Sequence, residues 1–242
     1  SEDEGEEDNT YLSYNMVVGE AADINLSLAF EVLDYALLSA PGAPLKQALL
    51  DAKIGKDIYG SFEDGIKQTY FSIVAKGANL SQKEEFVKVI RDTLTKIAEE
   101  GIDKKAVTAG INYYEFRFRE ADFSSYPKGL MYGLDILSSW LYDDTKPFCE
   151  VQLLEGFEFL KKALEEGYFE DLIRKYLLDN THGAILSLVP EKGLAAKRDK
   201  ELEEKLENYR KSLSDEELTR MVENTKALEA YQESEEDPEA LT

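Results

Sequence analysis

Residues 44–79 read PLKQALLDAKIGKDIYGSFEDGIKQTYFSIVAKGAN, the clearest structural pattern in the chain. The pattern predicts a short helix, a loop at Gly55 and two strands, Asp57 to Phe62 and Ile66 to Lys76. Glu63-Asp64-Gly65 joins the strands, and an Asp-Gly pair between strand-like runs is a strong hairpin signal. We therefore expect an antiparallel strand pair in the central sheet.

Long helices flank this hairpin. Asp23 is a suitable N-cap for a helix from Ile24 to Ser39. After the hairpin, Ser81 with Glu84 forms a capping-box pattern for a helix to about Glu100. Asp103 then begins a further helix that ends near Glu120. Strands and long helices in this order predict an α+β fold with a mostly antiparallel sheet.

The sequence divides into three parts. Residues 1–10 form an acidic tail that we expect to be disordered, and residues 11–190 form the α+β domain. Within that domain we also expect a first strand at 11–18, helices at 127–142, 147–167 and 168–178, and a last strand at 182–189. Residues 191–242 predict a helical hairpin, with helices before and after a turn near Ser212 to Ser214, and an acidic C-terminal tail.

The formal net charge of the 242 residues is −22. Direct nucleic-acid binding is therefore not expected, because phosphate contacts need clustered Lys and Arg. No apolar run approaches the roughly 20 residues that span a bilayer, so we expect a soluble protein without a membrane partner. Cys149 is the single cysteine and fits a reducing, cytoplasmic compartment. The chain opens on SEDEGEED without Met, which favours a piece of a longer polypeptide.

The sequence contains few residues that could catalyse hydrolysis. His182 is the only histidine, whereas zinc hydrolysis commonly needs two histidines one helical turn apart and a carboxylate. We interpret His182 as a strand residue and Cys149, which has no base nearby, as an inert buried thiol. We predict no catalytic residue, no cofactor-binding residue and no metal ligand. The run Tyr113 to Glu120, YYEFRFRE, is either a recognition surface or, as we prefer, a core stripe with paired charges.

Four segments resemble the non-catalytic second domain and the following linker hairpin of the pitrilysin/insulinase-type zinc metallopeptidases, in their presequence-protease branch. Residues 48–77 are similar to that domain's helix, turn and hairpin, and residues 93–120 to its next two helices. Residues 172–192 resemble its closing helix and last strand, and residues 212–242 the linker between the two halves of these enzymes. The order and spacing of the four segments make the resemblance specific.

The resemblance implies four homologous domains in two bowl-like halves that close around an unfolded peptide. The first domain would carry HxxEH and the zinc of the parent enzyme, so this chain would hold no cofactor of its own. Its partners would be the catalytic domain and the C-terminal half of the same polypeptide, together with peptide substrates of basic character. A related domain supplies an Arg and a Tyr to the reacting carbonyl. The matching positions here hold Leu49 or Leu50 and Lys56, with Tyr59 out of step, so we assign no such role.

The sequence thus leads to a structural and substrate-chamber domain of a zinc metalloendopeptidase that degrades short unstructured peptides, inactive as this fragment. An alternative is a self-standing, catalytically dead interaction module whose helical arm binds a separate partner. A third is an enzyme that uses carboxylates alone, although the sequence singles out no two that converge.

Overall fold

The computed structural model describes residues 5, 7–121 and 123–234. Part of the predicted acidic tail, residues 1–4 and 6, and the C-terminal residues 235–242 lie outside the described residues. Thr10, the last residue of that predicted tail, already belongs to the first strand. The chain separates into two compact units, one ending at Pro190 and one beginning at Glu191. Within the described residues no helix is long and apolar enough to cross a membrane.

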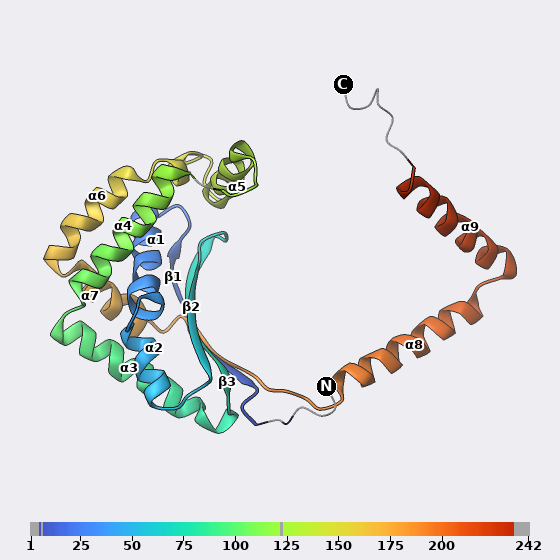
Figure 1. Ribbon diagram of the computed structural model, residues 1–242, viewed down its shortest axis with the longest axis horizontal. Coiled ribbons are helices and arrows are strands. Elements are labelled where there is room, and N and C mark those ends of the chain that lie inside the picture. The colour runs from blue at the N-terminus through green and yellow to red at the C-terminus, as the bar shows by residue number, and fades with distance from the viewer. Residues whose placement is uncertain (1–4, 6, 122, 235–242) are drawn as a thin grey trace. The chain divides into compact units, whose positions relative to one another are not determined.

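One antiparallel sheet forms the centre of the first unit (Figure 1). Its strands are β1 (Thr10–Glu20), β2 (Asp57–Glu63), β3 (Gln68–Ala78) and β4 (Gly183–Leu188), in the order β2-β3-β1-β4. In β1, buried and half-buried residues alternate from Thr10 to Gly19, as expected when one face of a sheet meets the core. The predicted α+β class with an antiparallel sheet is confirmed.

Helices lie on one face of this sheet, except α5, which lies beyond the end where β2 and β3 join (Figure 1). They are α1 (Ile24–Asp34), α2 (Pro44–Asp51), α3 (Lys83–Glu100), α4 (Lys104–Glu120), α5 (Lys128–Trp140), α6 (Leu154–Ala163) and α7 (Tyr168–Leu172). Short π-helical turns, Tyr35–Ser39 and Ile173–Leu178, extend α1 and α7 to the predicted helix ends. The predicted helix 147–167 is shorter than expected, because the chain before α6 forms only a 3₁₀ turn, Cys149–Val151.

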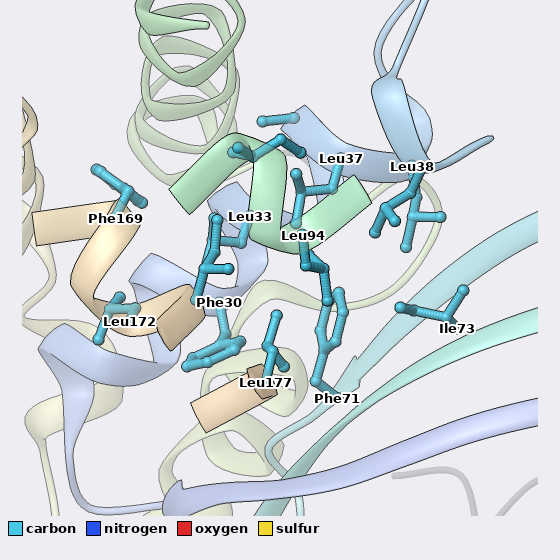
Figure 2. Packing of buried hydrophobic residues seen from close by; sticks show 14 of the residues in the cluster. Phe30, Leu33, Leu37, Leu38, Phe71, Ile73, Leu94, Phe169, Leu172 and Leu177 are labelled. Carbon is cyan, nitrogen blue, oxygen red and sulfur yellow. The ribbon is translucent and has the colours of Figure 1, made fainter. Parts of the chain in front are cut away.

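The core lies between the sheet and these helices, and its aromatic centre is Phe30 of α1 (Figure 2). The Phe30 ring lies 5.7 Å from Phe71, 5.8 Å from Phe62 and 5.8 Å from Tyr176, measured between ring centroids. Phe30 and Phe71 are fully buried, which stabilises the fold by about 1.5–3 kcal/mol for each side chain. Helix α1 is thereby fixed against β2, β3 and the turn that follows α7.

Two local predictions differ from the structure. Asn79 rather than Ser81 begins the α3 region, since Asn79 and Gln82 form the capping box of a 3₁₀ turn, Leu80–Gln82, that precedes α3. The hairpin loop is also longer than an Asp-Gly turn. Glu63 pairs with Tyr70 as the last rung, and the loop runs from Asp64 to Lys67. The side chain of Asp64 is enclosed and the hydroxyl of Tyr142 donates to the carbonyl of Gly65 over 3.5 Å, so the loop packs against the α5 region.

The second unit contains two helices, α8 (Leu194–Ser212) and α9 (Asp215–Gln232). Ser214 and Glu217 form the predicted capping box at the start of α9. No residue of either helix is buried, and apolar side chains such as Leu206 and Met221 are about half exposed. The two helices of the predicted hairpin are therefore present, but they do not bury their narrow apolar stripes against each other.

Candidate binding surface

The residues considered for catalysis lie apart from any chemical partner. His182 is exposed and lies just before β4 rather than in a strand as predicted; its backbone nitrogen donates to Asn180 Oδ1 over 2.8 Å and its carbonyl accepts from Val17 over 3.0 Å. Cys149 is half-buried rather than buried as predicted, and its Sγ lies 3.3 Å from the carbonyl oxygen of Lys146. Neither side chain has a base or a second ligand group beside it in the described part of the chain.

The donor set does not match the zinc centre that the resemblance implies for the parent enzyme. Among residues 5, 7–121 and 123–234, no group of three or more His, Cys, Asp or Glu side chains could hold a metal ion. Zinc sites use His, Cys and carboxylate ligands in close tetrahedral array, and the chain has one histidine and one cysteine. No step that depends on zinc can be assigned to these residues.

The run Tyr113 to Glu120 forms the second half of α4. Glu115 accepts from Arg119 over 2.6 Å and from Lys161 over 2.7 Å, and these two bonds hold the pKa of the Glu115 carboxyl below its usual range. Tyr114 and Phe118 pack against the core, whereas Arg117 lies over the ring of Tyr113. The preferred interpretation, a core stripe with paired charges, thus holds for Tyr114, Phe118 and Glu115, whereas Tyr113 and Phe116 are exposed.

The positions that match the family's Arg and Tyr hold a core leucine and a surface lysine. Leu49 is fully buried in the core, and Lys56 pairs with Asp8 over 3.5 Å. Tyr59 lies on β2 with 42% of its surface exposed. It points to the face of the sheet that the helices leave uncovered, as the alternating burial of β2 shows.

That uncovered face, which we call the open face, is a surface on which a ligand could lie (Figure 1). Paired residues cross all four strands in rows. Tyr59, Val74, Ser13 and Leu186 form one row, and Ser61, Ser72, Asn15 and Ala184 form the next. A further pair, Tyr11 and Leu188, lies beyond the first row, with the ammonium of Lys76 5.9 Å from the Tyr11 ring centroid.

The centre of the open face is polar and internally hydrogen-bonded. Asn15 Oδ1 accepts from the hydroxyls of Ser13 and Ser72 over 2.8 and 2.7 Å, and Asn15 Nδ2 donates to the carbonyl of Ala184 over 3.2 Å. Both hydroxyl protons are therefore already used, and no base is present to activate either oxygen. Tyrosine and leucine side chains surround this centre. Such a surface presents apolar, amide and hydroxyl groups to a ligand.

A second feature, the acidic cavity, lies where the β2–β3 loop meets α1, α4 and α5. It encloses about 270 Å³. Carboxyl groups from four separate segments line it: Glu31 of α1, Asp64 of the loop, Asp135 of α5 and Glu150 of the 3₁₀ turn before α6. One arginine, Arg117 of α4, lines it as well. Its apolar wall includes the rings of Phe118, Tyr132 and Phe157.

Burial and mutual repulsion make these carboxyls weak acids. Burial, followed by the charges of Asp64 and Glu150, raises the pKa of Glu31 to about 8. Burial, followed by Asp64 and Asp135, raises the pKa of Glu150 to about 7. The pKa values of Asp64 and Asp135 are also raised, again mainly by burial. No local sequence pattern indicates this cluster, because each acid looks like one of many in an acidic chain.

Two families match this chain. Residues 1–114 match the peptidase M16 inactive domain, and residues 188–242 match the peptidase M16C associated family. Among curated proteins, Protein HypA of Clostridium perfringens is 44% identical over 232 residues, covering 96% of this chain and 24% of that protein. Presequence protease 1, chloroplastic/mitochondrial, of Arabidopsis thaliana is 34% identical over 224 residues, covering 90% of this chain and 21% of that protein. The chain thus spans about a quarter or less of these relatives.

Solved structures support the fold. The inactive peptidase domain of a Bordetella parapertussis protein superposes with a TM-score of 0.59 at 12% identity, covering 76% of this chain and 94% of that one. The peptidase M16 inactive domain from Pseudomonas fluorescens superposes with a TM-score of 0.53 at 13% identity, covering 75% of this chain and 40% of that one. At these identities the likeness concerns the fold alone.

Proposed function

We propose that this chain, which belongs to the peptidase M16 family, forms a non-catalytic wall of a chamber. In that chamber the parent enzyme degrades short unstructured peptides. The observation that carries the proposal is the open face: a four-stranded sheet with helices on one side and tyrosine, leucine and amide groups on the other. Extended peptides bind such surfaces through apolar contacts and hydrogen bonds. The parent's zinc and its ligands would then come from another domain.

The charge of the chain favours peptides of basic character. With a formal net charge of −22, the chain attracts cations over distances of about a Debye length, and this raises the encounter rate of basic peptides. The acidic cavity adds a local negative site beside the β2–β3 loop. Partners on the same polypeptide would be the catalytic domain and the other half of the enzyme, with α8 and α9 as the connection between halves.

Steady-state kinetics of the full-length parent test the chamber-wall role. Leu186→Ser and Tyr59→Ser remove exposed apolar area from the open face, and Leu80→Ser is a matched control because Leu80 is about half exposed in a turn away from that face. We expect KM for a peptide to rise several-fold in the first two variants with kcat nearly unchanged, because ground-state and transition-state binding are lost together. Unchanged KM in both would count against the proposal.

A second measurement concerns the chain by itself. The 242-residue chain should show no chelator-sensitive peptide hydrolysis, beside a zinc-containing, active parent. Hydrolysis by the isolated chain would overturn the non-catalytic assignment and direct attention to its carboxylates.

A further inference from the structure

The acidic cavity holds more negative charge than its own residues can balance. Four carboxyl groups and one guanidinium line it, which leaves three formal negative charges when all are ionised. Arg117 does not neutralise them directly. Its guanidinium lies over the Tyr113 ring, 5.7 Å from the centroid, and it forms no ion pair with a lining acid among the described residues.

Two of the carboxyls have no partner in the part of the chain that the structure describes. Glu150 Oε1 is inaccessible to solvent and accepts no hydrogen bond from a described residue. Glu31 is half-buried, makes no hydrogen bond or ion pair with the described residues, and lines the same cavity. Buried polar groups are nearly always paired, because an unpaired one loses its hydration without compensation. Two unpaired carboxyls around one cavity therefore indicate a missing cationic group.

The cavity's size and walls select the kind of cation. At about 270 Å³ it lies just below the roughly 300–1,000 Å³ of small-molecule sites, which suits a single long side chain. Carboxyls that approach from four segments suit a planar guanidinium, which carries five N–H donors in fixed directions. The rings of Phe118, Tyr132 and Phe157 can pack against its flat face or its methylene stem. A metal ion fits less well, because no three of the described acids converge on one point.

We propose that the acidic cavity is a subsite for one arginine side chain of a bound peptide, with Glu31 and Glu150 as its principal partners. The inference rests on the proposed function, since the peptide is the one held by the open face. The cavity lies at the hairpin end of the sheet: Asp64 lines it and directly follows Glu63, whose partner Tyr70 alternates with Ser72 and Val74 of the open face.

Direct binding to the 242-residue chain tests this assignment. The probe is a blocked, fluorescent peptide with a single arginine among alanine, serine and leucine, and its control carries citrulline, which has the same shape without the charge. At pH 8.5 we expect the arginine peptide to bind at least tenfold more tightly than the citrulline peptide. In the Glu31→Gln/Glu150→Gln double variant, both peptides should bind equally. The Glu85→Gln/Glu99→Gln double variant, in two exposed acids on α3, removes the same number of carboxylates and should preserve the preference.

Equal binding of the two peptides by the unaltered chain would overturn the proposal, whatever the variants do. So would a full arginine preference in the double variant. If circular dichroism shows that the double variant is unfolded, Asp135→Asn, in another acid of the same cavity, replaces it in the test. The arginine preference should then fall several-fold. An unchanged preference would refute the subsite. Failure here would leave the chamber-wall role intact, because that role is judged by KM in the parent after substitutions on the open face.

Discussion

Oδ1 of Asp34, at the end of α1, occupies the space in which a side chain on Gly60 of β2 would begin. A Cβ added at Gly60 would collide with this oxygen and with Cδ1 of Leu38. The oxygen is buried and accepts no hydrogen bond among the described residues, while Oδ2 accepts weakly from Ser39 over 3.4 Å. Burial raises the pKa of Asp34 to about 6. Glycine at position 60 is therefore a packing requirement between helix and sheet.

We expect Gly60→Ala to lower the free energy of unfolding by about 1–3 kcal/mol, because overpacking forces the helix and the edge strand apart. Urea denaturation monitored by circular dichroism measures the change. Gly65→Ala is the control, since a Cβ at Gly65 meets no atom within 4 Å and its φ is not positive. Equal stability of Gly60→Ala and Gly65→Ala would show that Asp34 moves without cost.

The start of α3 gives a direct comparison between two candidate caps. Asn79 Oδ1 accepts from the backbone of Asp8 over 2.9 Å, and the backbone of Asn79 donates to Gln82 Oε1 over 2.9 Å. Asn79→Ala should cost about 1 kcal/mol of unfolding free energy, as is typical of a lost N-cap. Ser81→Ala, at the residue that sequence patterns favour, should stay within about 0.5 kcal/mol. A larger loss at Ser81 than at Asn79 would contradict the observed cap.

Stability should fall as pH rises through neutrality. The carboxyls of Glu31, Glu150 and Asp34 have pKa values raised to about 8, 7 and 6, mainly by burial, so the folded chain binds their protons more tightly than the unfolded chain. This contribution is fully present below the unfolded pKa values near 4 and is lost as pH rises towards 8. We expect a total loss on the order of 2–4 kcal/mol between pH 5 and pH 9, after solvent screening.

Thermal denaturation across that pH range measures the effect. The Glu31→Gln/Glu150→Gln variant should flatten the profile, because its amides carry no titratable proton. Asp8, Glu115 and Glu217, whose pKa values are lowered by hydrogen bonds and ion pairs, should act in the opposite sense at acid pH only. A profile that rises between pH 6 and pH 8 would contradict the assignment of buried acids.

Arginine binding should show the reverse dependence on pH. Arginine keeps its charge throughout, whereas Glu31 and Glu150 must lose protons before they can bind it. The charged and titratable groups around Glu31 are Asp34 of its own helix, Asp64 of the hairpin loop, Arg117 and Tyr114 of α4, and Glu150. Affinity for the arginine peptide should therefore rise about tenfold from pH 6 to pH 8.5. Affinity that stays constant, measured by the same fluorescence titration, would exclude these two acids as partners.

Hydrogen exchange should separate the two units. Backbone amides of α8 and α9 should exchange far faster than those of β1, because neither helix buries a side chain and most helical stability in proteins comes from tertiary packing. Mass spectrometry after seconds of labelling gives the comparison. Protection of α8 and α9 equal to that of β1 would show that their exposed leucines are covered in solution.

Much of the fold follows from local patterns. The α4 helix begins after Asp103, and α9 begins after Ser214 with Glu217, as capping rules predict. Where two acceptors compete, as Asn79 and Ser81 do, the choice depends on contacts with Asp8, far away in the sequence. The hairpin loop differs from an Asp-Gly turn for the same reason, since Asp64 and Gly65 pack against the α5 region.

The functional features were less accessible from sequence. An antiparallel sheet with helices on one side predicts an open face. The residues that form its rows depend on strand register, however, and the register shift in β1 between Thr10 and Leu12 cannot be predicted from the sequence. The acidic cavity is harder still. Glu31, Asp64 and Glu150 belong to three distant segments, and only the packing of α1 against the hairpin loop and the chain before α6 brings them together.

The position of β1 in the middle of the sheet affects how the first unit folds during synthesis. Residues of β1 pair on one side with β3 and on the other with β4, the last element before Pro190. A growing chain therefore carries an unpaired strand edge until residue 188 has left the ribosome, and folding must wait for a contact that spans nearly the whole unit. A chain released before Gly183 would leave one edge of β1 without its partner strand β4. Because unpaired strand edges promote aggregation, we expect a chain that ends before β4 to aggregate.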